Sequence, residues 1–376
     1  MKRLATAFCG WLLLASPLVA AENKAETKKV DLVICLDTSN SMDGLINSAK
    51  AKLWDIVNEL ASAKPTPKLR VALYSYGNDN YDRGKGYIRK DLDLTDDLDL
   101  LYQKLFALQT RGGTEYATRV ARDAIRDLAW SKEADALKIV FVCGNEPANQ
   151  DRTVGFQDVA ELAAKQSIIV NTIYCGQRNH RDARSWQQFA SAAGGEFTCI
   201  NQNRGTVAIA TPHDKKLAEL SQELNKTYVV YGGAEGKAKQ ENQVAQDANA
   251  RRAGQGVFAA RALAKASTLY NNASWDLVDR MLRDPKFDIK KIPEEQLSEE
   301  LKKLKTPEAR LKYLKDMAAK RAAIQKEIQD LSAKRAAYIA EYNKKNPSPA
   351  DKEFGEAIRA TLRKQAQTRG IQIEDK

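Results

Sequence analysis

The chain has 376 residues, 43% hydrophobic and 29% charged, a composition that suits a globular protein of two domains and excludes wholesale disorder. The formal net charge of +11 is uneven, because residues 231–376 carry +9 of it while residues 22–230 are neutral. The two histidines, His180 and His213, are too few for a His-rich zinc site or for catalysis by several imidazoles.

The first 21 residues predict a secretory signal peptide. Lys2 and Arg3 precede an uncharged stretch that Pro17 breaks, and the small residues Val19-Ala20-Ala21 follow. The alternative is an uncleaved anchor helix, because the 18 uncharged residues could almost span a bilayer. The positions of the proline and the small residues favour cleavage, and no later stretch is long and apolar enough to cross a membrane. We therefore expect a periplasmic or secreted protein without a transmembrane segment.

Strands and helices alternate over residues 28–205. A nearly continuous apolar run at 30–36 predicts a strand covered on both faces, and helical spacing follows over 45–60. Further strands are predicted at 69–76, 87–94, 137–142, 167–174 and 197–200. Strands separated by helices imply right-handed crossovers, so we predict an α/β fold with a Rossmann-like, doubly wound, mostly parallel sheet.

Four cysteines fall in or beside these predicted strands. An oxidising compartment permits a disulfide, but the spacing does not identify a pair. We interpret the four as small buried hydrophobic residues: Cys35, Cys143, Cys175 and Cys199.

No strand pattern returns after about residue 233, and we predict an all-α region. A connecting helix is expected within 206–232 and a helical region over 233–300. From Leu314 to Tyr342 apolar residues recur at steps of three and four, a coiled-coil stripe that Arg321 and Arg335 interrupt. A Pro-rich break and one last helix follow, so a helical hairpin or coiled coil is the simplest arrangement for 306–368.

Oxygen-bearing side chains gather in three loops that follow predicted strands or open predicted helices. The first loop is Asp37-Thr38-Ser39-Asn40-Ser41, the second Arg111-Gly112-Gly113-Thr114-Glu115, and the third Cys143-Gly144-Asn145-Glu146-Pro147. Ligands of parallel sheets bind beyond the carboxyl ends of the strands, and oxygen is the donor that hard divalent cations prefer. In the alternative interpretation, the serines of the first loop only cap the helix that follows.

The sequence Asp37-x-Ser39-x-Ser41 after an apolar first strand, followed by a Gly-Gly-Thr loop, resembles the von Willebrand factor A domain. In that family the DxSxS motif, a threonine and a later aspartate form a metal-ion-dependent adhesion site (MIDAS). The resemblance covers roughly residues 28–205 and implies metal-binding roles for Asp37, Ser39, Ser41 and Thr114.

The later aspartate of the family has no match here. The family's Thr-Asp-Gly falls on Cys143-Gly144-Asn145. Asn145 and Glu146 are the candidates to replace the missing carboxylate, directly or through water, and we include Glu146 in the predicted site. More narrowly, residues 144–147, 171–176 and 270–276 resemble a bacterial group of exported proteins with this domain.

The resemblance implies an exported binding or scaffold protein, not an enzyme, that holds Mg2+, Mn2+ or Ca2+. An acidic side chain of a partner protein then completes the metal's shell. One alternative is a cell-envelope structural protein whose basic helices contact an anionic surface. A metal-assisted hydrolase ranks third, because we find no convincing general base. Export and the absence of a nucleic-acid motif argue against a nucleic-acid partner.

Overall fold

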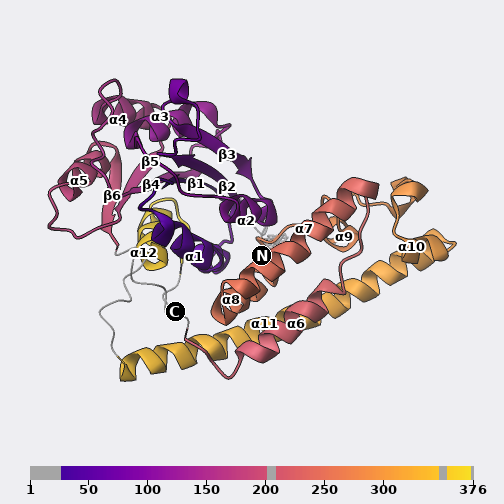
Figure 1. Cartoon of the computed structure of the whole chain (residues 1–376). Coiled ribbons are helices and arrows are strands. Elements are labelled where there is room, and N and C mark those ends of the chain that lie inside the picture. Colours follow the sequence, from indigo (N-terminus) through magenta and orange to yellow (C-terminus); the bar gives the residue numbers. More distant parts are fainter. Residues whose placement is uncertain (1–26, 201–208, 347–353, 374–376) are drawn as a thin grey trace, which may run out of the picture.

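The computed structural model describes residues 27–200, 209–346 and 354–373. Its sheet has six strands in the order β3-β2-β1-β4-β5-β6, and only β3 runs antiparallel to its neighbour. The strands are β1 (Lys29–Asp37), β2 (Lys68–Tyr76), β3 (Ile88–Thr95), β4 (Leu137–Gly144), β5 (Ile169–Tyr174) and β6 (Gly194–Cys199). The predicted doubly wound, mostly parallel sheet is confirmed (Figure 1).

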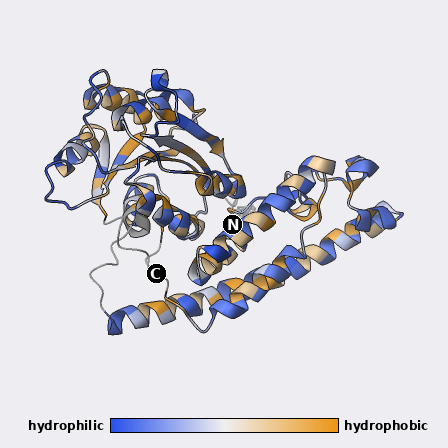
Figure 2. Ribbon diagram, viewed as in Figure 1, coloured by the Kyte–Doolittle hydropathy of each residue, from blue (hydrophilic) through white to orange (hydrophobic). Residues whose placement is uncertain are grey.

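Helices cover both faces of this sheet. One face carries α1 (Asp43–Ala61) and α2 (Leu98–Phe106), and the other carries α3 (Ala117–Asp127), α4 (Phe156–Lys165) and α5 (Ala183–Ala192). Successive residues of β1 belong alternately to the two cores, because neighbouring side chains of a strand point to opposite faces. The hydropathy colouring shows the same arrangement, with apolar strands between helices whose outer faces are hydrophilic (Figure 2). Covering on both faces explains why β1 is a continuous apolar run.

The rest of the chain is helical, as predicted. It comprises α6 (Asp214–Asn225), α7 (Gly233–Arg252), α8 (Gln255–Lys265), α9 (Leu277–Arg283), α10 (Glu299–Lys303), the 39-residue α11 (Pro307–Lys345) and α12 (Phe354–Gln367). Helices α6, α8 and α11 pack together around Leu217, Leu224 and Ile328, each of which is completely buried.

A buried charge cluster joins the helical region to the sheet domain, where α7 contacts α2 and α8 contacts α1. The guanidinium of Arg261 on α8 lies 2.7 Å from Asp99 on α2 and 2.6 Å from Asp247 on α7. It also lies over the ring of Trp54 on α1, 4.7 Å from the ring centroid. A buried charge needs such partners, so the pairing fixes how α7 and α8 sit on the sheet domain.

The two arginines that interrupt the apolar stripe of α11 form ion pairs with other segments of the same chain. Arg321 is buried, 2.6 Å from Asp276 and 2.7 Å from Asp279 at the start of α9. Arg335 lies 2.8 Å from Asp214, the first residue of α6. Both interrupt the stripe because α11 packs on its own chain through ion pairs as well as apolar contacts.

The predicted helical hairpin over residues 306–368 is wrong for α12. This helix packs against α1 of the sheet domain, with Ile358 and Leu362 completely buried in the same core as the apolar face of α1. Figure 1 shows α12 beside α1, well away from the C-terminal end of α11. An amphipathic helix binds whichever apolar surface is open to it, and here the face of α1 beside the sheet supplies that surface.

The predicted signal peptide at residues 1–21 lies outside the described residues. Within the described ranges, no helix combines the length and the apolarity needed to cross a bilayer. Cys35, Cys143, Cys175 and Cys199 are free thiols, and the first three are buried, as expected for small hydrophobic residues.

Candidate metal site

The site begins at the carboxyl end of β1. This strand lies in the middle of the sheet between β2 and β4, so the loops after β1 and β4 meet at one edge. Asp37 is the last residue of β1, and α1 begins six residues later at Asp43.

Asp37 is completely buried and only partly hydrogen-bonded. Its Oδ1 accepts a hydrogen bond of 2.8 Å from the backbone N–H of Ser39, whereas its Oδ2 is buried without a hydrogen-bond partner. The hydroxyl oxygens of Ser39 and Ser41 lie 3.5 Å apart, so both hydroxyls turn toward one point. A buried carboxylate oxygen without a partner is costly, and a cation beside it would remove that cost.

The second loop is fastened to the first by its backbone. The N–H of Asn40 donates to the carbonyl of Gly112 at 2.7 Å, and the N–H of Arg111 donates to the carbonyl of Thr38 at 2.9 Å. The following Gly113 has no room for a side chain, because a Cβ there would lie 2.1 Å from the carbonyl oxygen of Gly77. The glycine pair therefore lets the second loop lie directly on the backbone of its neighbours.

This close approach sets Thr114 and Glu115 beside the first loop. Thr114 is half-buried, and Glu115 is buried, with 6% of its surface exposed. Nε2 of Gln150 donates a long hydrogen bond of 3.4 Å to Glu115. The sequence places the carboxylate of Glu115 in the second loop, but the predicted metal ligands do not include it. Its position directly after the matched threonine was the available signal.

In the third loop, Asn145 and not Glu146 contacts the first loop. Nδ2 of Asn145 donates to Oγ of Ser41 at 2.9 Å, and Oδ1 of Asn145 is buried without a partner. The side chain of Glu146 is exposed, while its backbone carbonyl accepts a 2.7 Å hydrogen bond from the indole of Trp186. The structure therefore brings together Asp37, Ser39, Ser41 and Asn145, with Thr114 in the adjoining loop and Glu146 at the rim.

The acidic groups of the site carry perturbed pKa values. Burial raises the pKa of Asp37 well above its ordinary value, and the charge of Glu115 adds to this against the hydrogen bonds of Ser39. Burial also raises the pKa of Glu115 to about 7; a hydrogen bond from Ser39 opposes the rise and the charge of Glu146 adds to it. Burial and the neighbouring negative charge both disfavour the ionised form, so two buried carboxylates close together without a cation have raised pKa values.

The donor set fits a hard divalent cation. It consists of carboxylate, hydroxyl and amide oxygens, two of which are buried without partners. The described residues include no group of three or more His, Cys, Asp or Glu placed to hold a metal. A cation at this edge would thus depend on hydroxyl and amide oxygens in addition to the carboxylates.

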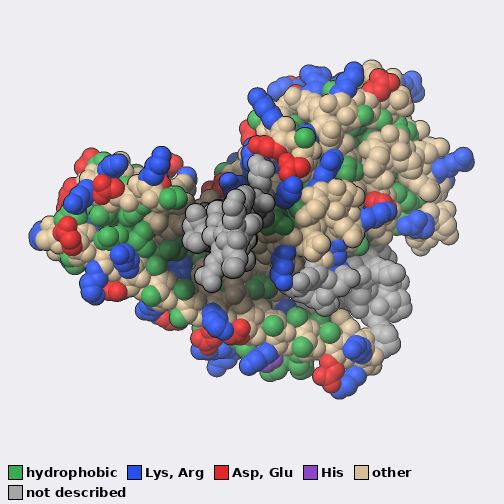
Figure 3. All heavy atoms as spheres, turned by 180° about the vertical axis from the view of Figure 1, so that it is seen from behind, with side chains coloured by type: hydrophobic (Ala, Val, Ile, Leu, Met, Phe, Trp, Pro, Cys, Tyr) green, Lys and Arg blue, Asp and Glu red, His purple; other side chains and the backbone are tan. Residues whose placement is uncertain are grey.

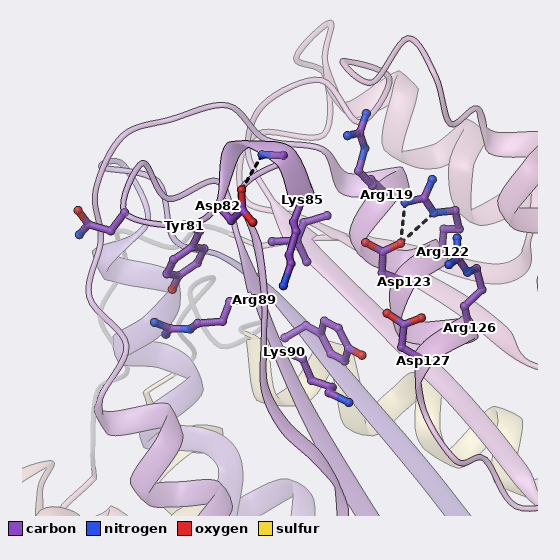
Figure 4. Close-up of a pocket in the computed structure, with 14 residues that line it drawn as sticks. Tyr81, Asp82, Lys85, Arg89, Lys90, Arg119, Arg122, Asp123, Arg126 and Asp127 are labelled. Carbon is purple, nitrogen blue, oxygen red and sulfur yellow. Dashed lines mark hydrogen bonds and ion pairs between the residues drawn. The ribbon is translucent and has the colours of Figure 1, made fainter.

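A separate cleft of about 720 Å³ lies between β3 with its preceding turn and helix α3 (Figure 4). Six Lys or Arg residues and three Asp residues line it, and Asp123 pairs with Arg122 at 2.7 Å. Four of the six cations already pair with carboxylates, namely Arg89, Lys90, Arg119 and Arg122. Because most of these charges are already satisfied, the cleft is a weaker candidate site than the edge beyond β1.

Comparisons with known proteins concern the sheet domain. Residues 31–212 match the family model described as the von Willebrand factor type A domain. No curated protein matches the chain.

Solved structures give distant matches over less than half of this chain. Proximal thread matrix protein 1 from the mussel byssus, described with a zinc-occupied MIDAS motif, is 15% identical over 46% of this chain and 42% of its own, with a TM-score of 0.37. The VWA domain of SpRpn10 is 14% identical over 46% of this chain and 88% of its own, with a TM-score of 0.36. The pilus adhesin SpaC from Lactobacillus rhamnosus GG is 12% identical over 47% of this chain and 28% of its own, with a TM-score of 0.37. The chain thus spans about two fifths of the length of the first of these proteins.

Proposed function

Because residues 31–212 are a von Willebrand factor type A domain, commonly a metal-dependent protein-interaction module, we propose that this chain is an exported binding protein, not an enzyme. Its contact with a partner protein depends on a divalent cation held beyond β1. The expectation of export comes from the signal-peptide pattern of residues 1–21.

The observation that carries the proposal is the buried, unpartnered Oδ2 of Asp37 beside two neighbouring hydroxyls. Asp37, Ser39, Ser41 and Thr114 supply oxygens to the ion, and Asn145 or Glu146 takes the place of the family's later aspartate. Mg2+, Mn2+ or Ca2+ all suit oxygen ligands, and Mg2+ keeps several waters when bound. The bound cation supplies a coordination position for an acidic side chain of the partner, so contact depends on the metal.

Calorimetric titration of Mg2+ and Mn2+ into the purified protein tests the proposal. We expect one saturable site whose affinity falls at least about 100-fold in Asp37→Ala, since even the loss of a supporting group costs about 10- to 100-fold. Glu161→Ala is the matched control, because Glu161 is an exposed acid on α4. Equal affinity of Asp37→Ala and the unaltered protein for both metals would contradict the proposed site.

A second candidate is a structural role at the cell envelope through the basic helical region. The excess charge of +9 over residues 231–376 favours it. Against it, Lys and Arg are interspersed with Asp and Glu on the face shown in Figure 3, and exposed i,i+4 pairs such as Lys312–Asp316 and Lys326–Asp330 lie along α11. Salt-sensitive binding to anionic vesicles that EDTA leaves unchanged would support this role over the metal-dependent one.

A further inference from the structure

We propose that Glu115 supplies the second protein carboxylate of the cation site, in place of the aspartate expected after β4. This inference rests on the proposed metal site and specifies its ligands. It gives the ion two negative charges from the protein, from Asp37 at the end of β1 and from Glu115 in the loop before α3.

The carboxylates of Asp37 and Glu115 lie beside each other at the end of β2. Gly77, directly after β2, has a φ of +75°, and a Cβ there would lie 2.8 Å from Cγ of Glu115 and 2.9 Å from Oδ1 of Asp37. Both carboxylate side chains therefore flank the same point of the backbone, where only glycine fits. The loops bring the two acids together although 77 residues separate them in the sequence.

Within the described part of the chain, no cationic side chain compensates these two acids. Asp37 and Glu115 are both buried, yet neither forms an ion pair with a described Lys, Arg or His. Elsewhere in this protein, buried acids pair with arginine: Asp31 with Arg70 at 2.8 Å and Asp151 with Arg119 at 2.6 Å. Buried charges as a rule are paired or coordinate metals, so the two unpaired acids indicate a bound cation.

The third loop places a neutral amide, not a carboxylate, beside the first loop. Asn145 occupies the place next to the Ser41 hydroxyl, and its amide offers a neutral oxygen, Oδ1, that is buried without a partner. Glu146 is exposed, so its carboxylate is already solvated. The charge that a family aspartate would bring at the third loop thus comes here from the second loop.

Two protein carboxylates change what the site requires from a partner. A divalent ion held by one protein carboxylate needs a further acidic ligand to balance its charge, whereas two protein carboxylates balance it before a partner binds at the remaining coordination position. We therefore expect the protein alone to bind Mn2+ and the partner's ligand to be exchangeable with water.

The test is calorimetric titration of Mn2+ into four forms of the protein: unaltered, Asp37→Asn, Glu115→Gln and Glu146→Gln. We expect Glu115→Gln to weaken Mn2+ at least about tenfold, as removal of a charged ligand should, and Glu146→Gln to change it less than about threefold. Thermal unfolding in EDTA gives a second readout. Glu115→Gln should unfold no earlier than the unaltered protein, because it removes a like charge beside Asp37, and should lose the stabilisation by Mn2+.

The outcomes separate the two proposals. If Asp37→Asn loses Mn2+ binding while Glu115→Gln retains it, the role of Glu115 is overturned and the metal site stands. If Glu146→Gln is the variant that loses affinity, the second carboxylate belongs to the third loop. If the unaltered protein binds no Mn2+, the metal site itself fails.

Discussion

Gln365 of the C-terminal helix and Asn171 of the inner strand β5 exchange two hydrogen bonds, of 2.7 and 3.0 Å, across 194 residues of sequence. Both side chains are buried, and ion pairs from Arg363 to Glu59 and from Lys364 to Glu196 lie beside them. The residues after α12 continue the attachment, since the backbone of Gln372 exchanges hydrogen bonds with that of Lys64 in the α1–β2 loop. Helix α12 is therefore a structural part of the sheet domain.

This attachment predicts a cost for removing the apolar contacts of α12. Leu362 is completely buried, so Leu362→Ala should lower the free energy of unfolding by about 2–5 kcal/mol, as large-to-small changes in cores do. Urea unfolding followed by circular dichroism measures it. Gln367→Ala, at an exposed position of the same helix, is the control. A similar small effect for both variants would mean that α12 docks only loosely.

The buried Arg321 predicts a second large effect. Arg321→Ala leaves Asp276 and Asp279 without their cation, and breaking such a buried pair costs about 3–5 kcal/mol. The urea midpoint should fall accordingly, whereas Lys326→Ala, which removes a surface pair on the same helix, should leave it nearly unchanged. An unaltered midpoint in Arg321→Ala would show that α11 does not depend on this anchor.

The left-handed backbone conformation of Gly77 predicts that a side chain at this position would disturb the cation site. Gly77→Ala places a side chain at φ +75° and against both Asp37 and Glu115. The left-handed conformation alone costs about 1–2 kcal/mol, and displacement of the two carboxylates should also weaken Mn2+. Gly155→Ala is the matched control, because its Cβ would meet no atom nearer than 3.5 Å. Normal Mn2+ affinity in Gly77→Ala would show that the carboxylates are not held as tightly as we describe.

The raised pKa of Glu115 predicts how stability depends on pH in EDTA. The pKa is about 7 in the folded protein against an ordinary value of 4.5, so between these values the folded state binds more protons than the unfolded state. The contribution of Glu115 to the free energy of unfolding therefore falls as the pH rises from 4.5 to about 7. Thermal midpoints from about pH 5 to about pH 8 should fall less in Glu115→Gln than in the unaltered protein. Saturating Mn2+ should reduce or reverse the fall in midpoint, because it favours the ionised carboxylates. If the midpoints of the unaltered protein and Glu115→Gln fall equally with pH in EDTA, Glu115 does not cause the pH dependence.

The local patterns of the sequence predict most of the sheet domain, because strands buried on both faces and helices with one apolar stripe leave clear periodicities. The first loop of the site is likewise readable, since Asp37, Ser39 and Ser41 lie within five residues. Contacts between distant segments are different. Glu115 lies beside Asp37 only because the Gly-Gly loop sits directly on the backbone of Gly77.

The same limit explains the error over α12. Its apolar positions predict an amphipathic helix but do not say which surface covers them, and α11 is the nearest helix in the sequence. The arginines of α11 gave a partial signal, because a charged residue in an apolar stripe implies a specific partner. That partner is Asp276 for Arg321, 45 residues away, which no local pattern reveals.

The place of α12 also has a consequence for how the protein is made. The last strand of the sheet ends at Cys199, but the helix that completes the α1 side begins only at Phe354. At about 5–20 residues per second, a ribosome needs on the order of 10 to 30 s to synthesise the intervening chain. Until α12 follows, part of the apolar side of α1 has no permanent cover, so the incomplete chain exposes an aggregation-prone surface.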